Sequence, residues 1–189
     1  MRNADLRSHI EKIVSLTDEE FEIIKAHFTQ KQFKKNDFLI EKGDLVSSSY
    51  FVISGLLKLI YLDDSGKENT VSFAMEDWWE SDFSAFHTQT KATMSLQCLE
   101  DTLVLCLTFE NYKKLCETFQ KMEFFFLTKA NSGHLASQQR ILSFLSSNAK
   151  ERYEQLLKKY PSLIQRVPKT LIASYLGVSR ETLSRLYSS

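Results

Sequence analysis

The chain has 189 residues, of which 43% are hydrophobic and 25% charged, and its formal net charge at pH 7 is zero. This composition is typical of a globular protein, and no apolar run approaches the roughly 20 residues of a membrane-spanning helix, which excludes a membrane partner. Its three cysteines form no Cys-x-x-Cys pair, so we expect neither a disulfide framework nor a structural metal. The charged N-terminus does not resemble a secretory signal, and the cytoplasm is the expected location.

The zero net charge hides an uneven distribution along the chain. Residues 140–189 carry nine basic and three acidic side chains, which gives +6, and residues 1–139 carry the balance of −6. A basic segment on an acidic chain is typical of a nucleic-acid partner, although a solvated basic surface would give the same count.

Helical periodicity marks the first thirty residues, from Ile10 through Ile24 to Phe28. From Phe33 to Thr108 the pattern changes to short apolar runs separated by turn residues such as Gly55 and Gly66. The expected strands are 38–40, 50–53, 56–62, 70–73, 96–98 and 103–107. Short strands with glycine at the turns predict an antiparallel barrel or sandwich.

Helices are predicted for the rest of the chain, at 110–116, 118–147, 149–160, 171–176 and 180–187. The long helix at 118–147 needs a partner for its apolar side, either its own β-domain or a second copy of the chain. Because Phe124, Phe125 and Phe126 cannot all face one side of a helix, we expect contacts with both. The predicted fold class is α+β, with a β-domain at 1–117, a dimerisation helix at 118–147 and a helical domain at 148–189.

The last two helices have the spacing of a helix-turn-helix motif. Pro168 can open the first helix, Gly177 supplies the left-handed backbone of the turn, and Ser179 can cap the second helix. Leu183 would then face the first helix and leave the polar residues outward. This arrangement predicts that the second helix lies in the major groove of DNA.

Three outward residues have side chains suited to reading bases. Arg180 and Arg185 can donate to guanine O6 and N7, and Glu181 can accept from a cytosine amino group. Contacts with phosphates or nearby base edges are expected from a second set: Lys169, Thr170, Ser179, Thr182 and Ser184. A solvated helix with a Glu181–Arg185 pair is the alternative, but glycine, cap and apolar spacing together favour DNA reading.

The segment IASYLGVSRETLSRL is similar to the helix-turn-helix of the CRP/FNR family of bacterial transcription regulators. The β-rich part resembles the cyclic-nucleotide-binding-type jelly roll of that family at Gly43-Asp44, at 54–58 and at 64–68. The resemblance covers nearly the whole chain in the same order. It implies an N-terminal jelly-roll sensor, a homodimer formed through the long helix, double-stranded DNA as a partner, and RNA polymerase as a plausible further one.

The segment that resembles the nucleotide pocket departs from the family pattern. In members that bind cyclic AMP or cyclic GMP, a Gly-Glu pair opens a short helix and an arginine about ten residues later holds the phosphate. Here Ser81 and Asp82 replace the pair and Ala92 stands at the arginine position, which disfavours a cyclic nucleotide. We expect a pocket for an unidentified small-molecule effector, lined by Trp78, Trp79, Ser81, Asp82, Lys91 and Thr93.

No cofactor is expected. No cysteine precedes Cys98, so the iron–sulfur cluster of the oxygen-sensing branch is not predicted. Haem would need His87 or His134 as a ligand, and a lone histidine is more often part of a surface or core. A metal-dependent cupin enzyme would need several histidines on neighbouring strands, and only His87 lies in the β-rich part, so no enzyme activity is predicted.

The leading hypothesis is a homodimeric transcription regulator modulated by an effector. The alternatives are an effector-independent regulator with a degenerate sensor domain and a cyclic-nucleotide-responsive regulator. The sequence ends at Ser189, directly after the second helix of the motif, so no hairpin wing is expected there.

Overall fold

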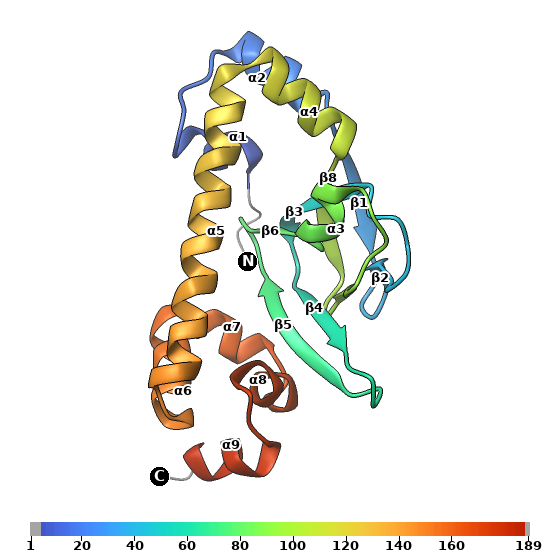
Figure 1. Ribbon diagram of the computed structural model, residues 1–189. Helices are drawn as coiled ribbons and strands as arrows, with labels where there is room; N and C mark the ends of the chain where they lie inside the picture. Colours follow the sequence, from blue (N-terminus) through green and yellow to red (C-terminus); the bar gives the residue numbers. More distant parts are fainter. Residues whose placement is uncertain (1–4, 188–189) are drawn as a thin grey trace.

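A computed structural model describes residues 5–187 of the chain (Figure 1). Two short helices come first, α1 (Leu6–Glu11) and α2 (Asp18–Lys25). The side chain of Asp5 caps α1, and Thr17 and Glu20 form a capping box at the start of α2. The expectation that the helical pattern continues to Phe28 is wrong, because Phe28 begins the first strand and pairs with Leu107.

Eight strands form two antiparallel four-stranded sheets with the orders β1-β8-β3-β6 and β2-β7-β4-β5. Their bounds are β1 (Phe28–Phe33), β2 (Phe38–Ile40), β3 (Ser48–Ser54), β4 (Leu57–Leu62), β5 (Glu68–Ala74), β6 (Trp79–Glu80), β7 (Ser95–Cys98) and β8 (Thr102–Thr108). The six predicted strands are confirmed. Strands β1 and β6 were not predicted, because β1 has a polar, exposed middle and β6 has only two residues.

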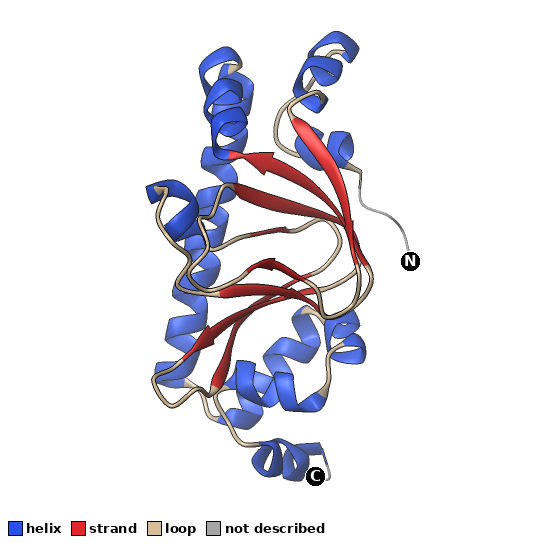
Figure 2. Ribbon diagram, turned by 90° about the vertical axis from the view of Figure 1, so that its right-hand side faces the viewer, coloured by secondary structure: helices blue, strands red, loops and turns tan. Residues whose placement is uncertain are grey.

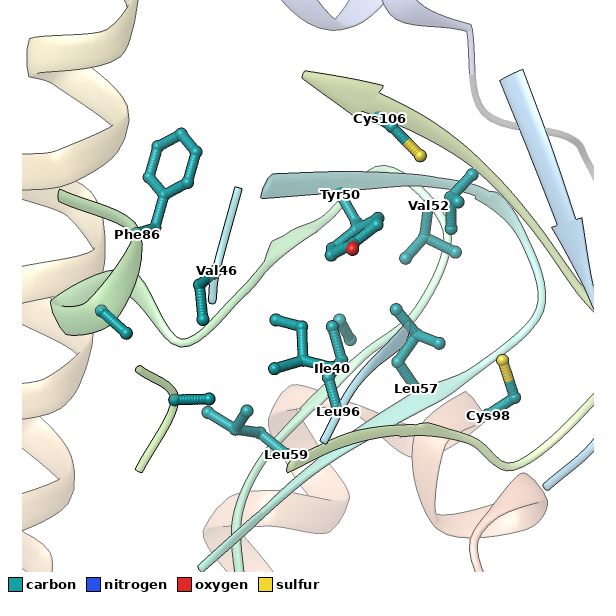
Figure 3. Packing of buried hydrophobic residues seen from close by; sticks show 14 residues of the cluster. Ile40, Val46, Tyr50, Val52, Leu57, Leu59, Phe86, Leu96, Cys98 and Cys106 are labelled. Carbon is teal, nitrogen blue, oxygen red and sulfur yellow. The ribbon is translucent and has the colours of Figure 1, made fainter. Parts of the chain in front are cut away.

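The main core of this jelly roll lies between the two sheets, where apolar side chains from both pack together (Figure 3). Tyr50, Val52, Leu57 and Leu96 are among its buried members, and the hydroxyl of Tyr50 donates to the carbonyl of Leu39 at 3.1 Å. Gly55, which precedes β4, has φ 110°, and a Cβ there would lie 2.4 Å from the hydroxyl of Thr102. Only glycine fits this position.

One short helix, α3 (Phe83–Thr88), lies between β6 and β7. Two more helices follow β8: α4 (Phe109–Thr118) and the long α5 (Gln120–Ser146). The first turns of α5 bury Met122 and Phe125 in a cluster with α1, α2 and the outer side of the first sheet. Farther along, every residue from 130 to 139 is exposed, so this part of α5 lies apart from the rest of its own chain (Figure 1). The predicted long helix is confirmed within two residues at its start and one at its end.

The tail consists of α6 (Ala149–Lys159), α7 (Pro161–Arg166), α8 (Lys169–Leu176) and α9 (Arg180–Tyr187). Pro161 ends the preceding helix as predicted, but it also begins α7, which was not predicted, because proline fits the first helical turn. Tail residues such as Leu163 and Ile172 share a core with Leu56 and Phe73 of the jelly roll. In Figure 2 helices lie above and below the strands, and the predicted α+β class is confirmed.

Polar contacts also hold the tail to the jelly roll. The guanidinium of Arg166 lies 2.7 Å from a carboxylate oxygen of Glu76 and 2.7 Å from one of Glu100, and it donates to the carbonyl of Gly55 at 2.9 Å. The hydrogen bonds that Arg166 donates to Glu100 and, to a lesser extent, to Glu76 raise the pKa of its guanidinium. The backbone N–H of Thr70 donates to the hydroxyl of Ser174 at 2.9 Å, which ties β5 to α8.

Candidate nucleic-acid interface and sensor pocket

Helices α8 and α9 are joined by a tight turn at Gly177. This glycine has φ 69°, and a Cβ there would lie 2.9 Å from the ring of Phe144, so both conformation and space require glycine. The N–H of Thr182 donates to the hydroxyl of Ser179 at 3.1 Å, as expected of an N-cap. Leu183 is buried in the core of the tail. The predicted turn, cap and apolar contact are therefore all present.

The outward side of α9 presents five exposed polar side chains, which we call the recognition face: Arg180, Glu181, Thr182, Ser184 and Arg185. Four of them line a shallow depression of about 310 Å³: Arg180, Glu181, Ser184 and Arg185. Hydrogen bonding at the start of the helix lowers the pKa of Glu181, and the nearby arginines act in the same direction. At neutral pH the face thus combines cationic donors with one anionic acceptor.

The basic residues of the tail fall into two groups. Three of the nine bind carbonyls or carboxylates inside the protein. Arg140 donates to the carbonyl of Tyr175 at 3.0 Å and also to that of Val71, Arg152 donates to the carbonyl of Leu176, and Arg166 binds Glu76 and Glu100. The other six are exposed: Lys150, Lys158, Lys159, Lys169, Arg180 and Arg185. The sequence count of +6 therefore overstates the charge available to a partner.

The residues of the second predicted contact set are all exposed. Lys169 and Thr170 are exposed in the first turn of α8. The hydroxyl of Ser179 serves the cap and lies 3.2 Å from that of Thr182. These two hydroxyls are thus already engaged with the start of α9.

The two tryptophans predicted to line one pocket lie in different clusters. Trp79 packs between the first sheet and the helices, with its ring centroid 5.4 Å from that of Phe51, and its indole N–H donates to Nε2 of His9 at 3.2 Å. Trp78 packs against the core between the sheets and makes an edge contact with Tyr160, with ring centroids 4.9 Å apart. Trp78 directly precedes β6 and Trp79 is its first residue, and successive side chains of an extended segment point to opposite sides.

Asp82, another of the predicted pocket residues, is fully buried and is hydrogen-bonded by the exposed Thr93, which was also predicted to line the pocket. One carboxylate oxygen accepts from the N–H and the hydroxyl of Thr93, at 2.9 and 3.0 Å, and from the N–H of Met94 at 3.2 Å. The other accepts from the N–H of Ala85 at 3.1 Å. Ser81, which is also buried, donates its hydroxyl to the carbonyl of Ser48.

No cation takes the arginine position of the nucleotide-binding pattern. Ala92 is buried in the core, and its backbone N–H and carbonyl bind Asp44 and Gly43. Lys91 lies next to it and is exposed. Of the six residues predicted to line the pocket, Asp82 and Thr93 are joined by hydrogen bonds, and the buried Ser81 next to Asp82 donates to Ser48 instead.

Glu80 is a buried polar residue that the sequence analysis missed. Its carboxyl group accepts from the hydroxyl of Ser72 at 2.6 Å and from the N–H of Ser81 at 3.1 Å. Burial raises the pKa of Glu80 to about 7, because a charged carboxylate is poorly stabilised away from water. The signal that could have revealed it is strand alternation: because Trp79 packs on the outer side of the first sheet, the next residue, Glu80, has to face the interior between the sheets.

The two candidate haem ligands lie in unrelated surroundings. His87 packs among aromatic rings, with its centroid 5.1 Å from that of Phe86 and 5.5 Å from that of Tyr112. His134 is exposed in the middle of α5. Within residues 5–187, no group of three or more His, Cys, Asp or Glu side chains could hold a metal ion, and no helix is long and apolar enough to cross a membrane.

Comparisons with known proteins agree with this geometry. The cyclic nucleotide-binding domain family matches residues 30–119. The chain is 27% identical over 190 residues to the transcriptional activator protein anr of Pseudomonas aeruginosa, covering 93% of this chain and 76% of that protein. It is 28% identical over 170 residues to the anaerobic regulatory protein of Haemophilus influenzae, covering 83% and 65%. These similarities support a transcription regulator of the CRP/FNR type.

Solved structures of regulators share the fold of this chain. FixK2 from Bradyrhizobium japonicum superposes with a TM-score of 0.71 at 17% identity, covering 85% of this chain and 83% of that one. The catabolite activator protein of Thermus thermophilus gives a TM-score of 0.59 at 22% identity, covering 92% and 83%. At these identities the likeness concerns the fold alone.

Proposed function

We propose that this chain is a homodimeric, sequence-specific DNA-binding regulator of the CRP/FNR type that reads bases with Arg180, Glu181 and Arg185. The observation that carries the proposal is the recognition face of α9, which is exposed beside a buried Leu183 and a capped turn. A helix held in this way can enter the major groove without rearrangement of its supporting core.

Each recognition residue has a defined role in this proposal. Arg180 and Arg185 donate to guanine O6 and N7, and Glu181 accepts from a cytosine amino group. Thr182 and Ser184 bind phosphates or neighbouring base edges, and Lys169, Thr170 and Ser179 bind phosphates. The exposed lysines of α6 would add attraction that does not depend on sequence: Lys150, Lys158 and Lys159.

Helix α5 supplies the proposed dimer contact. Its exposed apolar side chains include Phe124, Leu127, Leu135 and Leu142, which are 55 to 60% exposed. An exposed helix with such a set of apolar residues is stabilised when it packs against a copy of itself. A two-fold dimer would place two recognition helices in successive major grooves, about 34 Å apart, on a pseudo-palindromic site. RNA polymerase is a further proposed partner.

The leading proposal includes an unidentified effector in the jelly roll, and an effector-independent regulator is the alternative. The hydrogen bonds of Asp82 argue against one class of effector, an anion that would need the same donors. Asp82 already has four hydrogen-bond donors, and Ala92 provides no cation for a phosphate. A cyclic nucleotide would find its anion-binding groups occupied.

Selection from random duplex DNA tests the proposal. The wild-type protein should enrich a pseudo-palindromic sequence, and Arg180→Ala or Arg185→Ala should each weaken binding to it about 5- to 150-fold, from the 1–3 kcal/mol of a bidentate base contact. Lys159→Ala is the control, since loss of one phosphate contact weakens binding to all sequences alike. Unchanged sequence preference in both arginine variants would refute the role of the recognition face.

A further inference from the structure

The carboxylate of Asp82 is held in a cradle of neutral donors. Its side chain is 0% exposed, and its two oxygens accept three backbone N–H groups and one hydroxyl, at 2.9 to 3.2 Å. We call these donors, from Ala85, Thr93 and Met94, the anion cradle. Burying a carboxylate is costly unless such bonds replace its water, so the cradle and the carboxylate stabilise each other.

The cradle is built from the two segments on either side of the loop that follows α3. Ala85 lies in α3, and Thr93 and Met94 lie at the end of loop 89–94, just before β7, so the carboxylate joins the helix to the end of this loop. Converging backbone N–H groups form a binding site for anions in general. In this chain the anion at that site is a side chain of the protein itself.

We propose that Asp82 is the permanent occupant of the anion cradle, so that the jelly roll keeps its folded shape without an anionic effector and excludes phosphates and cyclic nucleotides. This inference rests on the proposed function, because it concerns regulation at the sensor pocket of a DNA-binding regulator. The buried Ala92 beside Thr93 is consistent with it, since a second, external anion would meet no cation there.

The proposal has a direct chemical consequence. Removing the carboxylate leaves three N–H groups and a hydroxyl facing a cavity of carboxylate size. A small external anion such as formate can fill that cavity and accept the same hydrogen bonds. The variant should therefore be stabilised by formate in a saturable way, whereas the wild-type protein should not.

Thermal unfolding of Asp82→Ala and Asp63→Ala tests this consequence. Asp63 is a matched control, because it accepts four comparable hydrogen bonds, from Ser65, Lys67 and Asn69, in an exposed turn. Asp82→Ala should unfold about 10 °C below the wild type. Sodium formate, compared with sodium chloride at equal ionic strength, should recover several degrees in Asp82→Ala alone. Equal responses in all three proteins would overturn the proposal.

A second pair of variants covers the case in which Asp82→Ala does not fold. Thr93→Val removes the one hydroxyl donor and should lower the unfolding temperature of the wild type by a few degrees, and by less in the Asp82→Asn background, where the acceptor is a neutral amide oxygen. An equal fall in both backgrounds would contradict the cradle. A saturable rise in wild-type stability with cyclic AMP would also contradict it. DNA binding is scored separately, so a wild type that binds no DNA refutes the proposed function and leaves the formate result interpretable.

Discussion

The recognition face of α9 and the anion cradle of the jelly roll use polar groups in opposite ways. Arg180, Glu181 and Arg185 are exposed, so their side chains are accessible to an external ligand. Asp82 is buried, and its oxygens are fully engaged by the chain's own donors. The chain thus presents exposed polar side chains on its last helix and a buried carboxylate in the jelly roll that is hydrogen-bonded by the chain's own groups.

The largest expected effect comes from breaking the proposed dimer that presents two recognition faces together. Leu135→Glu places like charges at the contact between two α5 helices, where Leu135 is 57% exposed in the single chain. A cost of about 4 kcal/mol corresponds to a roughly 1000-fold weaker dimer. Sedimentation velocity should then report a monomer. Leu157→Glu, on α6 and 43% exposed, is the control, and a dimer that survives Leu135→Glu rules out this contact.

The next largest effect concerns the ion pairs that hold the helical tail, which carries the recognition face, to the jelly roll. Arg166→Met leaves Glu76 and Glu100 facing each other without their shared cation, and Arg166 is only 15% exposed. Breaking a buried ion pair costs about 3–5 kcal/mol, which corresponds to a fall of about 10 °C in the unfolding temperature. Arg7→Met, which removes the exposed pairs with Glu11 and Asp18, should change it by less than about 4 °C. Equal effects would mean that the Arg166 cluster does not anchor the tail.

The smallest expected effect is a pH dependence of the free energy of unfolding that comes from Glu80, inside the jelly roll. Burial raises the pKa of Glu80 to about 7 from its usual 4.5, so the folded state binds this proton more tightly than the unfolded state. Protonated Glu80 therefore adds on the order of 3 kcal/mol to the free energy of unfolding below pH 4.5. This contribution is lost as the pH rises through 7. Urea unfolding from pH 5 to 8 should show this decline, and Glu80→Gln should flatten it. An identical pH dependence in both proteins would place Glu80 in water.

Local signals explain why the helix-turn-helix could be predicted. Gly177, Ser179 and Leu183 act on neighbours within a few residues, so their roles are visible in the sequence. The exposure of the recognition face follows from the same spacing, and it was predicted correctly.

The sensor region could be predicted only in outline, because its contacts are made across sheets and loops. Ser72, eight residues from Glu80, lies on the opposite sheet, and only the folded pairing brings the two together. The cradle of Asp82 likewise depends on Thr93, eleven residues away. The sequence showed that Ser81, Asp82 and Ala92 replace the residues of the nucleotide-binding pattern. It did not show that Asp82 would bind the backbone N–H groups of Ala85, Thr93 and Met94.

The affinity of the wild-type protein for its selected duplex, with and without excess cyclic AMP, tests the central claim most directly. If the recognition face is accessible and the cradle is filled by Asp82, the dissociation constant should stay within a factor of about 2, because an effector without a site gives no coupling. A change of about 5-fold or more on adding cyclic AMP, within the usual range of allosteric coupling, would contradict the account.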